Sequence, residues 1–559
     1  MDEIQGVNQG DPAAAPTAGR APLLEIAVLL LLGMALFGWR LGSHDLWPTD
    51  EPRFGQVAKE MRARGDFVVL SLNDHLYTEK PPLFFWAIDG FAALRGGVDE
   101  WAARLPSALA GVLSLLVILV FGESLFDRRT GFLGALIFAT SVQILERARW
   151  ASIDMTLTLF VTVAVALLWR AASAGGEGRS PWPARLAWLA MGLATLAKGP
   201  VGLALPILVV VPALLLAGDR RAVPRLFPLS GILIYMAVTL AWFGPFAARI
   251  GPDQAFRILT RQTVTRYVDA WNGRQPFWFY VWRFPVGFFP WSILLPWSVV
   301  AALLEFREPE RRAGRFLLVW VGVVLLFFSC STGKRGVYIM PLYPAAALTV
   351  ARLFTRDARR AIVQGTMTWA ALAVTAGVAV VTFGARRAPD LAGPAWGIGA
   401  CLLAGGLAAP ALARAGRSIA AARVLAATMA VILLVATEAV FPYVNRHLNL
   451  RGFAEQVRDR LRPEIPLATT EEKRDAWVFY SGRFVEELDT RPRLLAYLAA
   501  GPRRDLLIEE EELREIRPAL PEGTTEVLEG RVSGRPYHML RLPPSAGAPT
   551  DPATTGAGR

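Results

Sequence analysis

The sequence predicts a polytopic α-helical membrane protein with a small soluble α/β domain near its C-terminal end. Of the 559 residues, 53% are hydrophobic and only 19% are charged, and the mean hydropathy is +0.37. A water-soluble chain of this length carries more charge. The apolar residues also gather in blocks of about 17–25 residues, which is the length of helix that crosses a bilayer.

The first apolar block, Leu23–Trp39, follows a polar stretch rich in Ala, Pro and Gly. The block is long for a signal peptide and no small-residue cleavage site follows it, so it is predicted to be an uncleaved first span. We expect residues 1–21 to form a cytoplasmic tail and residues 22–442 to form the transmembrane domain. Within that domain the first outward loop covers residues 42–99.

Short arginine-bearing turns separate the later blocks and predict the topology. The positive-inside rule places these turns in the cytoplasm. One block, Leu83–Leu94, is too short to span and is predicted to be interfacial or re-entrant. The count is then about thirteen spans, with the N-terminus inside and the C-terminus outside. The same arginines account for the net charge of +12, so no nucleic-acid partner is expected. They are Arg128, Arg129, Arg179, Arg185, Arg220, Arg221, Arg225, Arg307, Arg311, Arg312, Arg315, Arg356, Arg359, Arg360, Arg414, Arg417 and Arg423.

The composition changes after Pro442, where charged residues begin to separate short strand-like and helical patterns. Such patterns occur in "PLATTEE", "AWVFYSG", "RDLLIEEEELREI" and "GRPYHMLRL". Residues 443–542 are therefore predicted to form a soluble α/β domain, and residues 543–559 a disordered tail. Both cysteines, Cys330 and Cys401, fall in apolar blocks, which indicates small buried side chains and not a disulfide or metal site.

The first outward loop concentrates charge beside the membrane. Asp50, Glu51 and Arg53 open an amphipathic segment that is predicted to lie along the membrane surface. At the end of the loop, Glu79 and Lys80 precede two prolines that stop any helix and hold a fixed corner. The alternative interpretation is a solvated loop whose basic residues bind lipid headgroups.

Ionisable residues recur at the outer ends of other apolar blocks. Placing an ionisable side chain at membrane depth costs free energy, so its presence there usually indicates a function. Lys198 and Lys334 could instead be snorkelling anchors, and Tyr338 and Tyr343 could be interfacial belt aromatics. Convergence of all of them on one face favours a site. The residues concerned are Arg147, Arg149, Asp154, Lys198, Lys334, Arg335, Tyr338 and Tyr343.

Carboxylates and cations on the outer face suit a lipid-linked phosphosugar. Lysine and arginine bind phosphate, and they would stabilise a phosphate leaving group as its charge develops. A carboxylate can orient or deprotonate an acceptor, or help to bind a metal. The pattern predicts transfer of a sugar from a polyprenyl phosphate by direct displacement at the anomeric carbon.

Seven motifs resemble, in order, those of the GT-C membrane glycosyltransferases. The resemblance is to the protein-mannosyltransferase-like group and above all to the aminoarabinose lipid A transferases, and it covers about residues 22–350. The motifs are "TDEPRFGQVAKEM", "YTEKPPLFFW", "ARLPSALAG", "RARWASIDM", "LAKGP", "RQPFWFY" and "STGKRGVYIMPLYP".

The resemblance implies roles for individual residues. Asp50, Glu51 and Asp154 would line the catalytic cavity. The basic residues implied to bind the donor phosphate are Arg53, Lys80, Lys198 and Arg274, to which Arg266, Lys334, Tyr338 and Tyr343 are added as candidates from this sequence.

The resemblance also implies a divalent metal at Glu79, as the one candidate cofactor. The usual histidine partner is absent, because Asn272 and Gly273 precede Arg274. His75 is the alternative partner within the first loop.

The implied function is transfer of 4-amino-4-deoxy-L-arabinose from a polyprenyl-phosphate donor to lipid A in a bacterial inner membrane. Alternatives are protein O-mannosylation or modification of another envelope glycan. A phosphate acceptor needs no base, whereas a hydroxyl acceptor would make Asp50 a general base. Two other classes remain: a lipid-linked sugar transporter, which predicts charges inside the spans, and a sensor whose soluble domain carries the function. The chain lacks an internal repeat, which weakens a transporter built from inverted halves.

Overall fold

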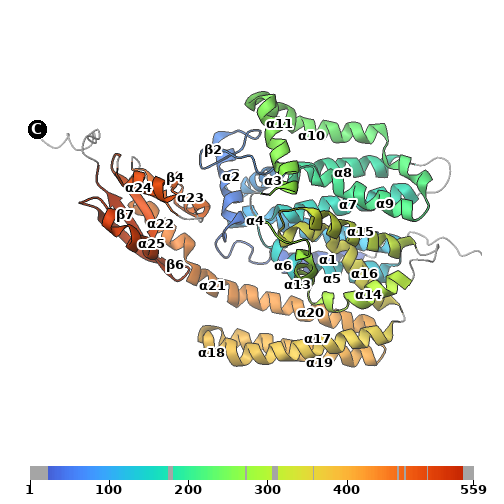
Figure 1. The fold of residues 1–559 in the computed structure, drawn as a ribbon. Coiled ribbons are helices and arrows are strands. Elements are labelled where there is room, and N and C mark those ends of the chain that lie inside the picture. Colours follow the sequence, from blue (N-terminus) through green and yellow to red (C-terminus); the bar gives the residue numbers. More distant parts are fainter. Residues whose placement is uncertain are drawn as a thin grey trace, which may run out of the picture.

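The computed structural model describes residues 23–173, 180–270, 273–304, 312–356, 358–462, 465–470, 474–499 and 501–544. The predicted N-terminal tail and residues 545–559 of the predicted C-terminal tail lie outside this range. Most described residues belong to helices that run along one direction of the molecule (Figure 1). The sheet of the C-terminal domain lies at one end of this bundle.

In the described part of the chain, eight helices are long and apolar enough to cross a membrane, or nine if the bent pair α5 (Arg128–Ala139) and α6 (Val142–Ala148) forms one span. The eight comprise α4 (Glu100–Leu125), α7 (Ile153–Ser173), α10 (Leu229–Ile250), α15 (Arg312–Cys330), η5 with α16 (Gly336–Thr355), α17 through α18 (Arg359–Arg387), η7 with α19 (Pro389–Arg414) and α20 through α22 (Ser418–Arg460).

The described residues therefore show eight or nine such helices where about thirteen spans were expected. The shorter apolar helices are α1 with η1 (Leu23–Gly38), α3 (Leu83–Ala92), α9 (Val201–Leu216) and α14 (Leu295–Leu304), and α8 (Trp182–Lys198) lies between α7 and α9. The remaining connecting helices are η2 (Arg220–Leu226), α11 (Pro252–Thr260), η3 (Arg261–Thr265), α12 (Arg266–Val268), α13 (Phe279–Gly287) and η4 (Trp291–Ile293). The predicted class, a polytopic helical membrane protein with a C-terminal sheet domain, is confirmed.

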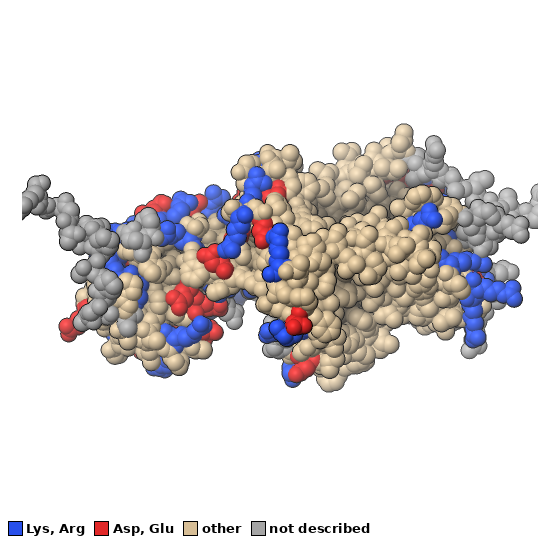
Figure 2. All heavy atoms as spheres, turned by 90° about the horizontal axis from the view of Figure 1, so that it is seen from above, with Lys and Arg blue, Asp and Glu red and all other residues tan. Residues whose placement is uncertain are grey.

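Charged residues gather at the two ends of the molecule and leave a broad uncharged band between them (Figure 2). This is the surface expected of a helical protein whose middle meets lipid, because charge is costly in hydrocarbon. The band supports the assignment of the bundle to a membrane.

The first loop folds into helix α2 (Asp50–Arg64), a hairpin of β1 (Ser71–Leu72) and β2 (His75–Leu76), and helix α3 (Leu83–Ala92). Helix α2 ends at Gly65, whose φ of 64° favours glycine. The predicted proline corner holds, since α3 begins directly after Pro82.

The apolar face of α2 packs against protein, which corrects the expectation that it rests on the membrane surface. Phe54 contacts the rings of Phe84 and Phe85 on α3 at centroid distances of 5.8 and 5.9 Å. Phe54 also belongs to a buried cluster that includes Trp477 and Phe479 of the C-terminal domain. The apolar face of α2 is therefore buried between α3 and that domain.

The C-terminal domain contains a five-stranded sheet in the order β4-β3-β5-β7-β6. Strands β3 (Leu467–Thr469), β4 (Val485–Glu487) and β5 (Arg504–Glu509) are parallel, whereas β6 (Thr525–Val532) and β7 (Arg535–Leu542) form an antiparallel edge. Its helices are α22 (Leu450–Arg460), α23 (Arg474–Ser481), α24 (Arg491–Ala499), α25 (Glu510–Ile516) and η9 (Arg517–Ala519). A long helical segment through η8 (Ala436–Val440) and α21 (Phe441–Leu448) leads into it (Figure 1).

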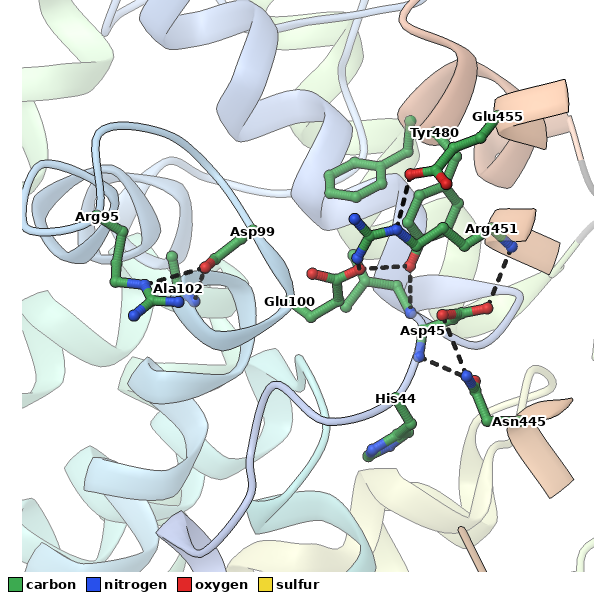
Figure 3. A network of polar contacts seen from close by, with 12 residues as sticks. His44, Asp45, Arg95, Asp99, Glu100, Ala102, Asn445, Arg451, Glu455 and Tyr480 are labelled. Carbon is green, nitrogen blue, oxygen red and sulfur yellow. Dashed lines mark hydrogen bonds and ion pairs between the residues drawn. The ribbon is translucent and has the colours of Figure 1, made fainter. Parts of the chain in front are cut away.

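Polar contacts fasten this domain to the first loop and to α4 (Figure 3). The Tyr480 hydroxyl accepts a hydrogen bond from the backbone N–H of Leu46 at 2.6 Å and donates one to Glu100 at 3.2 Å. Arg451 forms an ion pair with Glu100 at 3.3 Å, and its backbone N–H donates to Asp45 at 3.1 Å. These contacts fix the position of the domain beside the candidate site.

Candidate functional site

A cavity of about 440 Å³ opens where the first loop meets the ends of several bundle helices. Its polar side chains come from the first loop, the start of α7, the end of α8 and the segments around α12 and η5. Much of the remaining wall is apolar and includes Trp242, Phe243 and Phe246 of α10. A cavity that combines an apolar wall with converging charges is suited to a ligand that has a hydrocarbon part and an anionic head.

Asp50 lies in the first turn of α2 and faces this cavity. Its carboxylate pairs with Arg335, with Nη2 and Oδ2 separated by 2.6 Å. Burial acts to raise the pKa of Asp50, but Arg335 together with Arg53 and Lys80 outweighs burial and holds the pKa below its usual value. Asp50 is therefore ionised at neutral pH.

Asp154 lies in the first turn of α7 and forms an ion pair with Lys198, the last residue of α8. The Lys198 ammonium also lies 4.4 Å from the ring centroid of Tyr338. All three residues line the cavity. A lysine held by a carboxylate and by an aromatic face has a fixed position, which suits the binding of an anion.

Lys80 is the cation that the described first loop contributes to the cavity lining. Burial lowers the pKa of Lys80 to about 8, and the neighbouring cations Arg266 and Lys198 act in the same direction. Arg266 lines the same wall and approaches the Tyr338 hydroxyl at 3.4 Å. Mutual repulsion among these cations would be relieved by a bound phosphate, so the site is electrostatically suited to one.

Arg53 does not line the cavity directly. Its Nε donates to Asp475 of the C-terminal domain at 2.7 Å, and its Nη1 lies 3.6 Å from Glu79 at the cavity wall. The structure therefore places Arg53 behind the wall, between the cavity and the C-terminal domain.

Glu51 does not face the cavity, which corrects the expectation that it lines the site with Asp50. Its carboxylate accepts hydrogen bonds from Arg104 at 2.7 and 2.9 Å and from the backbone N–H groups of Trp47 and Ala151 at 2.9 Å each. Glu51 is 3% exposed and Arg104 is fully buried. This geometry gives Glu51 a structural role, linking α2 to α4 and to the approach to Asp154.

Three further candidates lie outside the cavity. The Lys334 ammonium donates to the carbonyl groups of Gln275 (2.8 Å) and Ser331, so its neighbour Arg335 enters the cavity in its place. Arg274 pairs with Asp269 and is exposed beside a separate groove. These two positions remove Lys334 and Arg274 from the set that surrounds Asp50 and Asp154.

Tyr343 is also removed from the cavity. Its side chain is completely buried in α16, where the hydroxyl donates to Gln143 at 2.8 Å and the ring packs on Phe284 and Phe288. Tyr338 lines the cavity, as already described. Of the two tyrosines, only Tyr338 is placed to contact a ligand.

The described residues contain no group of three His, Cys, Asp or Glu side chains that could hold a metal. Glu79 lines the cavity, but its nearest charged neighbours are the cations Arg53 at 3.6 Å and Lys80 at 3.9 Å. His75 contacts Phe484 instead. Asn272 lies outside the described residues. Two cations beside a lone carboxylate disfavour a divalent ion, so the residues at Glu79 do not fit the metal that the resemblance implied.

Two residues of the cavity were not predicted as site residues. Arg335 was noted only at the boundary of an apolar block, and Tyr77 was not selected. Tyr77 is part of the cavity wall, and its hydroxyl is buried and has no hydrogen-bond partner within the described structure. No signal in the sequence distinguishes Tyr77 from a packing aromatic, because its role depends on the position of the surrounding loops.

Comparison with known proteins gives the same fold. Residues 79–244 match the family described as dolichyl-phosphate-mannose-protein mannosyltransferase. The structure superposes on that of ArnT from Cupriavidus metallidurans bound to undecaprenyl phosphate with a TM-score of 0.76 and 24% sequence identity, covering 92% of this chain and 97% of that one. This chain and that protein share one fold over most of their lengths. The resemblance expected from the seven motifs is thereby confirmed.

Curated relatives of similar sequence include the undecaprenyl phosphate-alpha-4-amino-4-deoxy-L-arabinose arabinosyl transferases of two bacteria. The protein of Pectobacterium atrosepticum is 31% identical over 337 residues, which is 59% of this chain and 58% of the relative. That of Pseudomonas paraeruginosa is 32% identical over 337 residues, or 60% of each chain. The match thus spans three-fifths or less of each relative's length.

Proposed function

We propose that this GT-C protein is a glycosyltransferase that takes a sugar from a polyprenyl phosphate and transfers it to an acceptor at the cavity. The observation that carries the proposal is the cavity itself. It joins an apolar wall to the cations Lys80, Lys198 and Arg266 and to the carboxylates Asp50 and Asp154. An apolar groove suits the polyprenyl chain, and the cations suit the phosphate at its end.

In the proposed reaction an acceptor oxygen attacks the anomeric carbon, and the bond from that carbon to the phosphate oxygen breaks. The bonding electrons leave with the polyprenyl phosphate, which gains negative charge. Lys80 and Lys198 stabilise this charge most strongly in the transition state, which lowers the barrier. No proton needs to reach the leaving group, because a phosphate is a stable anion at neutral pH.

The ionised state of Asp50 supports an acceptor that is itself already ionised. Because Arg335 and its neighbours lower the pKa of Asp50, the carboxylate is a weak base. A hydroxyl acceptor would need a stronger base than this, whereas a phosphate acceptor needs none. Asp50 would then orient the reacting groups through Arg335. The specific proposal is transfer of 4-amino-4-deoxy-L-arabinose to a lipid A phosphate in a bacterial inner membrane, with the cavity and the C-terminal domain on the periplasmic side.

The test is mass spectrometry of lipid A and envelope glycans from cells with and without the protein, combined with transfer by the purified protein in liposomes. We expect an aminoarabinose mass on lipid A that depends on the protein. If lipid A is unchanged and another glycan loses a sugar, the acceptor is wrong but the reaction class holds. If no glycan changes and labelled donor only crosses the bilayer, the transporter alternative replaces the proposal.

Donor use is expected to fall as pH rises through about 8. The pKa of Lys80 is lowered to about 8, and a lysine loses its charge above its pKa, so phosphate binding weakens there. We expect kcat/KM for the donor to decline above this pH, and we expect Lys80→Arg to retain its charge and move the decline to higher pH.

Lys59 provides the matched control for this pH dependence. Burial also lowers the pKa of Lys59 to about 8, but its ammonium contacts the ring and the carbonyl of Phe479 and does not line the cavity. Lys59→Arg should leave the alkaline decline in place. If Lys59→Arg moves the decline to higher pH and Lys80→Arg does not, the decline arises from docking of the C-terminal domain and not from the cavity.

A further inference from the structure

The C-terminal domain inserts one buried carboxylate into the back of the candidate site. Asp475, in the first turn of α23, accepts a hydrogen bond from Arg53 Nε at 2.7 Å although 422 residues separate the two in the chain. The Asp475 side chain is 7% exposed and that of Arg53 is 27% exposed. The Nη1 atom of Arg53 lies 3.6 Å from Glu79, which lines the cavity.

The contact between α23 and α2 does not depend on this ion pair. A Cβ atom on Gly55 would lie 2.7 Å from the ring of Phe479, so the glycine permits a close approach of the two helices. The Lys59 ammonium donates to the Phe479 carbonyl at 2.8 Å. Near the hairpin, Asn73 makes two hydrogen bonds with the backbone of Val485, at 2.7 and 3.1 Å. The domain therefore has other attachments.

The interface holds other charged contacts, such as the ion pair of Arg451 with Glu100, but the pair of Asp475 with Arg53 is the one that reaches a residue of the cavity wall, Glu79. Burying a carboxylate is costly unless it is paired, and one oxygen of Asp475 (Oδ1) lacks a hydrogen-bond partner within the described residues. The other oxygen fixes the guanidinium of Arg53 in one orientation. Arg53 held in this way fixes Glu79, whose carboxylate lies 3.9 Å from the Lys80 ammonium, so this part of the cavity wall is ordered before a ligand binds.

We propose that Asp475 is a positioning residue of the candidate site: the C-terminal domain uses it to hold Arg53 against Glu79, and so to fix the cavity wall beside Lys80, where the phosphate of the lipid-linked donor would bind. This inference rests on the proposed function. It gives the domain a part in donor binding that is separate from its docking. Asp475 does not touch the ligand, and it acts only through Arg53.

The experiment is a double-mutant cycle on the full-length protein in detergent, with undecaprenyl phosphate as the binding probe. We expect Asp475→Asn to weaken binding by about tenfold and to raise the donor KM by a similar factor, with kcat nearly unchanged. We expect Arg53→Lys to weaken binding as well. The double variant should be little weaker than either single variant, because both changes remove the same arrangement.

The matched control is Asn73→Ala, which removes two hydrogen bonds from the same interface without touching Arg53. It should destabilise docking, seen as faster cleavage between the bundle and the domain by protease, yet its effect on binding should add to that of Arg53→Lys. Asp475→Glu restores the charge and should recover part of the affinity.

The outcomes separate the two proposals. Wild-type protein that neither binds undecaprenyl phosphate nor uses its sugar-linked form overturns the proposed function, and this inference falls with it. Wild-type protein that binds the lipid while Asp475→Asn binds it equally well overturns the inference alone. The inference is also overturned if the effects of Asp475→Asn and Arg53→Lys on binding add up, as those of Asn73→Ala and Arg53→Lys should. Asp475 would then be a docking contact only.

Discussion

Replacing Asp50 with asparagine is expected to reduce sugar transfer by about 100-fold or more, because the charge that holds Arg335 in place to orient the reacting groups is lost. Asparagine has nearly the same shape, so the cavity should persist. The pairing of Asp50 with Arg335 at 2.6 Å is lost along with the charge. The measurement is kcat and donor KM in liposomes, and we expect the loss mainly in kcat.

Asp154→Asn is expected to produce a loss of similar size by a different route. Without its partner carboxylate, Lys198 is no longer fixed against Tyr338, so the loss should appear in donor KM as well as in kcat. The matched control is Asp74→Asn, which changes an exposed carboxylate on the hairpin of the same loop. Asparagine tolerates the positive φ of 64° at that position. Full transfer by both the Asp50 and Asp154 variants would show that these carboxylates are dispensable, as a sensor or scaffold predicts.

Glu51→Ala is expected to destabilise the protein by about 3–5 kcal/mol, because it leaves the buried guanidinium of Arg104 without its partner. Arg104 is fully buried and its remaining hydrogen bonds go to the neutral carbonyl groups of Leu41, His44 and Asp45. The measurement is the free energy of unfolding in detergent, or the shift of the thermal midpoint where unfolding is irreversible.

Two comparisons separate this structural role from a catalytic one. The double variant Glu51→Ala with Arg104→Met removes both charges and should regain much of the lost stability. Asp74 forms an exposed ion pair with Arg64, which lies on the same helix as Glu51. Asp74→Asn should therefore change the free energy of unfolding by less than about 1 kcal/mol. If Glu51→Gln instead abolished transfer while leaving unfolding unchanged, the catalytic prediction for Glu51 would be restored.

The neighbouring carboxylates Asp50 and Glu51 show why the motif alone could not define the site. Successive residues of an α-helix point about 100° apart, so one faces the cavity while the other faces the bundle. The sequence does not reveal how α2 is rotated, because its apolar face meets the C-terminal domain as well as α3. The same difficulty separates Lys334 from Arg335, whose side chains leave an irregular segment in different directions.

Tyr338 and Tyr343 illustrate a second limit. Tyr338 lies in η5 and Tyr343 at the start of α16, but Tyr343 is buried against Gln143 while Tyr338 lies beside Lys198. An aromatic residue at a membrane boundary has the same sequence signature in either place. Asp475 was beyond prediction altogether, since nothing in a single sequence pairs it with Arg53 across 422 positions.

The sequence by itself determined that this chain is a helical membrane protein, that a sheet domain follows the bundle, and that carboxylates and cations gather at the boundaries of the spans. Those properties depend on composition and on local periodicity, which every segment carries on its own. Only the tertiary structure decided which charges share the cavity, which are neutralised in buried pairs, and which residue of the C-terminal domain reaches the first loop. These depend on helix rotation and on contacts between distant segments, because a charge becomes available or hidden only through the neighbours that desolvate and pair it.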